Sequence, residues 1–159
     1  LTAFSEKNPW AMDYALFMSL KYRNNQLPWT KWDDGFINRD ANTLQKYKNE
    51  FYDDINFWCF LQYLFFKQYF KLKEYANKQG VSIIGDIPIY VAEDSVDVWT
   101  EKELFMLDEN NLPICVAGVP PDDFSDDGQL WGNPVYDWEH LRKTEYKWWI
   151  DRIAFSFKK

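Results

Sequence analysis

Apolar residues recur at helical spacing near the start of the chain. Asn8-Pro9 suits a helix start, with Asn at the N-cap and Pro in the first helical position, and the periodicity then predicts a helix to about Tyr22. Residues 27–40 are predicted to form a loop, because Pro28 and Gly35 disfavour a continuous helix. A second helical pattern begins near Asn42 or Thr43. The first third of the chain is therefore predicted to be helical.

The strongest helical pattern covers Tyr52–Lys78 and ends at Gly80, which suits the position just after a helix. A last helix is predicted from about Glu139 to Phe155. The 52–78 helix is predicted to pack on a sheet through a nearly continuous apolar face, made of Ile55, Trp58, Leu61, Leu64, Phe65, Tyr69, Leu72 and Ala76.

One continuous apolar run, Ile83–Val91, has the pattern of a parallel strand that is buried on both faces, with Pro88 loosening its C-terminal end. A helix, a glycine and then a parallel strand make a right-handed crossover. Leu104–Leu107 and Pro113–Ala117 are predicted to form a hairpin through a polar turn. The long segment 118–134 is predicted to be a loop.

These elements predict an α/β chain in which four segments follow one another. They are a helical insertion at 1–50, a helix and strand at 51–91, a long loop region containing a hairpin at 92–137, and a helix at 138–159. A strand that carries an acid, followed by a loop rich in glycine, proline and rings, is how an α/β barrel builds the rim of a sugar site.

Composition narrows the ligand class. The chain is 20% aromatic and has a formal net charge of −7, which argues against nucleic acid or an anionic membrane as partner. Rings interleaved with acids and amides suit a neutral polyhydroxylated ligand. No signal peptide is recognisable, and polar residues interrupt the apolar stretch 57–70, so no membrane span is expected. Cys59 and Cys115 are predicted to be small buried thiols, and the location to be cytoplasmic.

The sequence lacks the residues that several common kinds of catalytic and binding site require. His140 is the only histidine, and there is no G-x-S-x-G or phosphate-binding glycine loop. The acids around Gly128 match the first positions of a calcium loop, but Pro134 stands where its bidentate Glu should be. No metal and no cofactor are therefore predicted.

Two residues are candidates for a binding role, each with a structural alternative. Asp86 lies within the apolar strand and needs a partner, which is either a neighbouring cation or a substrate hydroxyl. Trp131 lies beside Gly132 in the long loop, where its ring either receives a sugar face or pins the loop to the body.

The chain resembles glycoside hydrolase family 77, the amylomaltases or disproportionating enzymes, over nearly its whole length. The resemblance is carried by Trp10–Phe17 and Phe60–Gln68, by Gly85-Asp86-Ile87-Pro88-Ile89-Tyr90-Val91, by the strings Gly118–Asp122 and Gln129–Pro134, and by Tyr146–Ile150. Asp123 departs from the family pattern, which usually has Tyr or Ala there.

The resemblance implies an incomplete portion of a (β/α)8 TIM barrel with mainly helical insertions. It implies a cytoplasmic 4-α-glucanotransferase that transfers α-1,4-glucan segments with retention, without a cofactor, to a sugar acceptor. By the same resemblance Asp86 organises the subsite at the cleaved bond, and Asp122, Phe124 and Trp131 contact acceptor-side sugars. Tyr90 is a weaker candidate for sugar binding.

The family's nucleophilic Asp, acid/base Glu and third Asp correspond to positions beyond Lys159, so no acid here is predicted to be catalytic. Residues 1–159 alone are expected to be inactive, missing the remainder of the barrel. The alternatives are a non-catalytic glucan-binding module and an amylase-like barrel hydrolase; the latter is weakened because no Asn-His pair follows Asp86.

Overall fold

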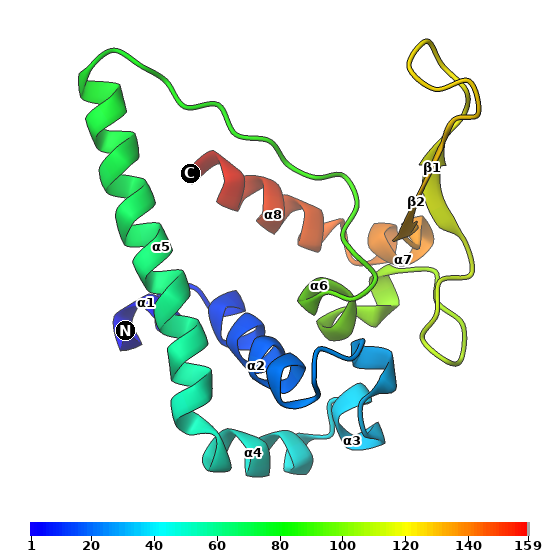
Figure 1. Ribbon diagram of the computed structural model, residues 1–159, viewed down its shortest axis with the longest axis horizontal. Helices are drawn as coiled ribbons and strands as arrows, with labels where there is room; N and C mark the ends of the chain where they lie inside the picture. The colour runs from blue at the N-terminus through cyan, green and yellow to red at the C-terminus, as the bar shows by residue number, and fades with distance from the viewer. Residues whose placement is uncertain (159) are drawn as a thin grey trace. The chain divides into compact units, whose positions relative to one another are not determined.

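The computed structural model describes residues 1–158, which form two compact units, 1–86 and 87–158 (Figure 1). The first unit is helical, with α1 (Thr2–Lys7), α2 (Trp10–Arg23), the 3-10 turn η1 (Trp29–Lys31), α3 (Asp34–Ile37), α4 (Ala41–Glu50) and α5 (Tyr52–Lys78). The second contains α6 (Val96–Thr100), the 3-10 turn η2 (Lys102–Leu104), β1 (Val116–Val119), β2 (Gln129–Pro134), α7 (Trp138–Lys143) and α8 (Lys147–Lys158). Within the described chain, no helix has the length and apolarity needed to cross a membrane.

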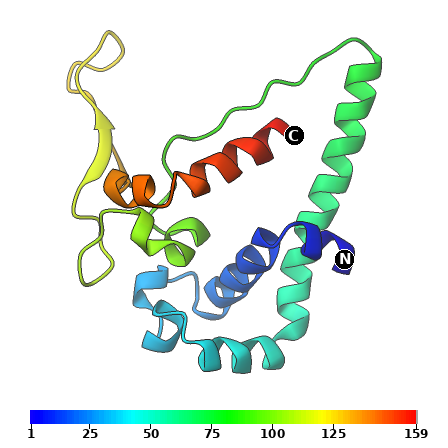
Figure 2. The same ribbon diagram turned by 180° about the vertical axis from the view of Figure 1, so that it is seen from behind.

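The core of the first unit lies where α2 packs along α5 (Figures 1 and 2). Ala11 and Ala15 of α2 and Cys59 of α5 are fully buried, since small side chains let two helices approach closely. The apolar face predicted for α5 is confirmed only in part. Ile55 is buried as predicted, but Phe66 is buried where Phe65 was predicted to be. Phe65 and two other residues of the predicted face, Leu61 and Leu72, are exposed.

The bounds predicted for α5, Tyr52–Lys78, are confirmed, and Gly80 ends it as expected. Gly80 has φ of +76°, its N–H donates to the Asn77 carbonyl, and Val81 N–H donates to the Ala76 carbonyl, each at 3.0 Å. These two bonds are the Schellman arrangement, which needs a left-handed residue. The predicted start of α2 is wrong in one detail, because the Asn8 side chain donates backwards to the Phe4 carbonyl at 2.9 Å. Asn8 therefore closes α1 instead of capping α2.

An antiparallel hairpin of β1 and β2 forms at both ends of the loop predicted at 118–134, and residues 120–128 remain as the connection between the strands. The strands approach so closely that a Cβ on Gly118 would lie 2.4 Å from the Gln129 carbonyl oxygen. Gly128, at φ +72°, ends the turn. The hairpin predicted over 104–117 is confirmed only near its turn, where Leu107 and Pro113 form an antiparallel bridge and the Ile114 N–H donates to the Met106 carbonyl at 2.9 Å. Farther from the turn the two arms part, because the chain from Val116 pairs with β2 instead.

The strand predicted at 83–91 is not formed among residues 1–158. The segment is irregular, and Ile84 and Ile89 are 93% and 66% exposed. A strand is defined by its ladder, and the described residues place no strand beside this segment. The crossover predicted from the same run is therefore absent from residues 1–158 as well.

The single helix predicted at 139–155 is divided into α7 and α8. Glu145 and Tyr146 both have positive φ, +54° and +56°, and the Tyr146 N–H donates to the Leu141 carbonyl at 2.7 Å. This is again a Schellman-type helix end, made here without a glycine. The apolar residues keep helical spacing across it, so the sequence pattern did not indicate that one helix ends and another begins. Asp137 caps α7 by accepting from the N–H groups of Glu139 and His140 at 2.9 Å.

Replacing Gly80 by Ala should lower the free energy of unfolding by about 1 kcal/mol, because a Cβ disfavours the left-handed conformation. No atom lies within 4 Å of the added Cβ, so backbone strain is the only cost. Gly85→Ala is the matched control, since its Cβ also meets nothing within 4 Å and its φ is not in the left-handed region. Urea unfolding of both variants checks this, and equal stability of the two would contradict it.

Candidate functional site

The structure places four of the five predicted binding residues, Tyr90, Asp122, Phe124 and Trp131, in the second unit. Asp86 is the last residue of the first unit and is exposed, so the expectation of a buried carboxylate is wrong for the described chain. The physical reason is the missing ladder around residues 83–91, since a strand buries its side chains only when neighbouring strands flank it.

Two of the predicted residues meet as a pair of rings. The Tyr90 and Trp131 ring centroids are 6.3 Å apart with an interplanar angle of 58°. Trp131 is 48% exposed, and its indole N–H donates to the Gln129 side-chain oxygen at 2.9 Å, which orients the ring along β2. Gly132, directly after the ring in β2, has φ of +79°, which is the left-handed region that glycine adopts without strain. The pair offers an amphipathic surface of the kind that receives a ligand with C–H faces and hydroxyls.

Asp122 organises the tip of the hairpin. One oxygen of its carboxylate accepts the N–H groups of Phe124 and Ser125, each at 2.9 Å, and its own N–H donates to the Ser125 carbonyl at 3.0 Å. The Ser125 hydroxyl then donates to the Gly128 carbonyl at 2.7 Å. Phe124 is carried on this tight turn with its ring 94% exposed. Asp122 thus acts in the structure as the group that shapes the turn.

Three side chains that the sequence analysis did not single out hold the backbone beside Tyr90. The Tyr136 hydroxyl donates to the Ile89 carbonyl and the Asn133 amide donates to the Val91 carbonyl, both at 2.8 Å. The Arg152 guanidinium donates to the Pro88 carbonyl at 3.0 Å. The only sequence signal was position, since Asn133 and Tyr136 directly follow the ring-bearing part of the hairpin.

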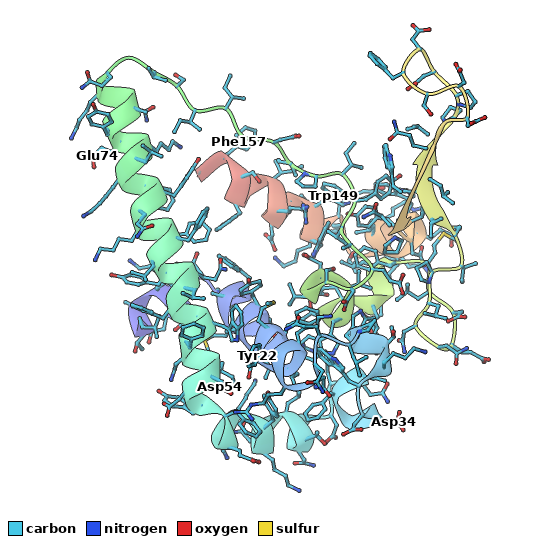
Figure 3. All side chains as sticks on the ribbon, viewed as in Figure 1. Tyr22, Asp34, Asp54, Glu74, Trp149 and Phe157 are labelled. Carbon is cyan, nitrogen blue, oxygen red and sulfur yellow. The ribbon has the colours of Figure 1, made fainter. Side chains whose placement is uncertain are left out.

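Arg152 joins this backbone to a partly buried charge. Its guanidinium lies 3.8 Å from the Asp97 carboxylate and 5.0 Å from the Trp148 ring centroid. Burial raises the pKa of Asp97, and the positive charge of Arg152 offsets part of that rise. Trp149, labelled in Figure 3, lies beside Trp148, with ring centroids 5.3 Å apart in an edge-to-face arrangement.

The two cysteines and the possibility of a metal site were also considered from the sequence. Cys59 is buried and burial raises the pKa of its thiol, whereas Cys115 is exposed, so the prediction of two buried thiols is wrong for Cys115. Cys115 directly precedes β1, and its neighbours Ile114 and Val116 are exposed as well. Across residues 1–158, no group of three or more His, Cys, Asp or Glu side chains is arranged to hold a metal ion.

Two hollows of about 630 and 570 Å³ lie in the first unit. The larger is lined by Ser19, Tyr22, Arg23, Asp54, Phe57 and Trp58, and Figure 3 labels Tyr22 and Asp54 on its two helices. None of the five predicted binding residues lines either hollow. The ring pair is an open surface of the second unit, and we take it as the candidate site because it unites two predicted residues.

The fold belongs to the amylomaltase class of structures. It matches the structure of an amylomaltase from Streptococcus agalactiae in complex with acarbose with a TM-score of 0.90 and 47% sequence identity. The match covers 96% of this chain and 31% of that one.

The chain belongs to the 4-alpha-glucanotransferase family, glycoside hydrolase family 77, whose family model matches residues 1–159. It is 51% identical over 154 residues to a 4-alpha-glucanotransferase of Clostridium butyricum, covering 96% of this chain and 32% of that protein. It is 46% identical over 152 residues to one of Thermus thermophilus, covering 95% of this chain and 30% of that protein. The chain thus spans about a third of the length of the relatives it matches.

Asp122→Ala should loosen the hairpin tip, because the Phe124 N–H loses its acceptor, whereas the Ser125 N–H keeps its bond to the Asp122 backbone carbonyl at 3.3 Å. Amide exchange of Phe124 should become faster by roughly threefold to tenfold, which corresponds to one net hydrogen bond, and exchange of Ser125 should change less. Asp122→Asn keeps an acceptor oxygen and should stay near the parent rate, and the exposed neighbour Asp123→Ala is the control. Slow exchange in Asp122→Ala would show that the backbone alone holds the turn.

Asp97 should make stability depend on pH. Because burial raises its pKa in the folded state, its contribution is full below the ordinary pKa of 3.8 and falls as pH rises through the higher folded pKa. Asp97→Asn should remove that decline and stabilise the protein at pH 7 relative to the parent. Urea unfolding at acid and neutral pH checks this, and the exposed Asp123→Asn is the control. If Asp97→Asn were less stable than the parent at pH 7, the ion pair with Arg152 would outweigh the cost of desolvation, which would contradict the prediction.

Proposed function

We propose that this chain is the glucan-binding part of a retaining 4-α-glucanotransferase, which moves α-1,4-glucan segments to a sugar acceptor. The observation that carries the proposal is the ring pair formed by Tyr90 and by Trp131 of β2, in a chain that belongs to this family along its whole length. The relative from S. agalactiae was solved with acarbose. We take a maltooligosaccharide or a longer α-1,4-glucan as the ligand of this chain.

The ring pair gives the surface its chemistry. A sugar presents an apolar C–H face and a rim of hydroxyls, so a half-exposed indole stabilises it by contact area while polar groups fix its orientation. Trp131 exposes 48% of its surface, and its N–H is already satisfied by Gln129, so ring contact costs no unpaired donor. We assign acceptor-side binding to Trp131 and Tyr90.

Phe124 extends this surface at the hairpin tip, where Asp122 fixes the turn that carries it. In the proposal the tip closes over the bound glycan and excludes water. A glycosyl-enzyme that water cannot reach is intercepted by a sugar hydroxyl instead, so closure favours transfer over hydrolysis. Asp86 is assigned to the subsite nearest the cleaved bond.

We assign no catalytic carboxylate to residues 1–158. Retaining transfer needs two carboxyl groups roughly 5 Å apart, one as nucleophile and one as acid/base. In the proposal these groups belong to the two thirds of the relatives' length that the chain does not cover, and residues 83–91 pair there with further strands of a (β/α)8 barrel. A cytoplasmic location is also part of the proposal, on the strength of the acidic composition and the two unpaired cysteines.

Trp131→Ala in the full-length protein should weaken use of the acceptor more than cleavage of the donor. The loss should be about 1–3 kcal/mol in transition-state stabilisation if the ring stacks on a sugar. Chain-length redistribution from maltotriose measures transfer, and glucose release at low acceptor concentration measures cleavage and hydrolysis.

Trp58→Ala is the matched control, since this partly exposed indole belongs to the first unit. It should leave both steps unchanged. Equal loss of transfer and cleavage in Trp131→Ala would refute the acceptor role of the ring. A high ratio of hydrolysis to transfer in the parent protein would favour an amylase-like hydrolase over a transferase.

A further inference from the structure

The backbone on both sides of Tyr90 is held by side chains rather than by strand pairing within residues 1–158. Three donors reach three carbonyls in this short stretch: Arg152 to Pro88, Tyr136 to Ile89 and Asn133 to Val91. The Ile89 carbonyl belongs to the peptide plane that leads into Tyr90. Because that plane is rigid, a bond to its oxygen fixes the orientation of the peptide that ends at the Tyr90 Cα.

Tyr136 also holds the Tyr90 ring itself. The two rings are stacked, with centroids 5.8 Å apart and an interplanar angle of 17°. Tyr136 therefore contacts both the Tyr90 ring and the peptide plane that leads into Tyr90. Its own ring is 1% exposed and cannot serve as a sugar surface.

The body of the second unit fixes Tyr136 in turn. Its ring lies against Phe105 at 5.2 Å and Trp149 at 5.3 Å between centroids, and its backbone forms a bridge with Phe105. The neighbouring Asp137 N–H donates to the Leu104 carbonyl at 2.8 Å. A series of contacts thus runs from the buried core through Tyr136 and Tyr90 to the half-exposed Trp131.

The Tyr136 hydroxyl is a donor at physiological pH, as any tyrosine with the ordinary pKa of 10.0 would be. Burial raises its pKa further, to about 12, with Arg152 partly offsetting the rise. A neutral hydroxyl donates to the Ile89 carbonyl, whereas a phenolate would repel it.

We propose that Tyr136 is a positioning residue for acceptor binding, which sets the angle of the Tyr90 ring beside Trp131 through its bond to Ile89 and its ring stack. The inference rests on the proposed function, because it assumes that the ring pair receives a sugar. It predicts that a buried hydroxyl, out of reach of the ligand, affects the acceptor step of the reaction and spares donor cleavage.

The test is Tyr136→Phe in the full-length protein, which removes one hydroxyl and keeps the ring. The KM for the acceptor, measured with glucose or maltose, should rise by roughly twofold to tenfold, as for one lost hydrogen bond, while donor cleavage stays at the parent rate. Asn133→Ala removes the donor to Val91 on the other side of Tyr90 and should raise the same KM.

Tyr47→Phe is the matched control. Tyr47 is also a buried tyrosine, and its hydroxyl lies 2.9 Å from the Ser19 hydroxyl in the first unit. A purely structural role of Tyr136 would make the two Tyr→Phe variants alike, with lower melting temperature and unchanged KM. That result in Tyr136→Phe and Asn133→Ala would overturn the inference.

A double-mutant cycle then shows whether Tyr136 acts through Tyr90. The rise in acceptor KM caused by Tyr136→Phe should disappear in a Tyr90→Ala background, and an undiminished rise there would overturn the inference. The proposed function fails separately, if Tyr90→Ala and Trp131→Ala both leave the acceptor KM unchanged. Normal losses in those two variants with a parent-like Tyr136→Phe would overturn the positioning role alone.

Discussion

The side chain of Tyr136 is the contact on which the second unit's candidate surface depends. Its hydroxyl bonds to the Ile89 carbonyl at 2.8 Å and its ring stacks on Tyr90, while Phe105, Trp148 and Trp149 surround it. Aromatic rings carry much contact area with few rotatable bonds, so a cluster of them is rigid. A rigid support lets an irregular segment such as 87–91 present a side chain in a defined direction without a strand ladder among the described residues.

Different interactions stabilise the two units. The first buries small side chains between α2 and α5, where close helix packing gives the stability. The second has little regular structure and relies on rings, on glycines that let β1 and β2 approach, and on side-chain bonds to backbone carbonyls. A binding surface benefits from the second arrangement, because irregular backbone exposes side chains that a strand or helix would bury.

Sequence reasoning succeeded where the signal was local. The bounds of α5 and its end at Gly80 follow from helical spacing and one left-handed position. It failed where a partner distant in sequence decides the outcome. The run 83–91 has a strand's composition but no ladder within residues 1–158, and the last helix breaks at Glu145 without a glycine to mark it.

The amino-acid sequence by itself determined the helical segments, the acidic and aromatic character, and the family, because these depend on spacing, composition and motif. Only the tertiary structure decided that β1 pairs with β2, that Asp122 shapes a turn, and that Tyr90 meets Trp131 over Tyr136. Each of those outcomes joins residues far apart along the chain or depends on the direction of a single side chain. Local propensity carries neither kind of information, since both are set by which groups the packed chain brings within a few ångströms.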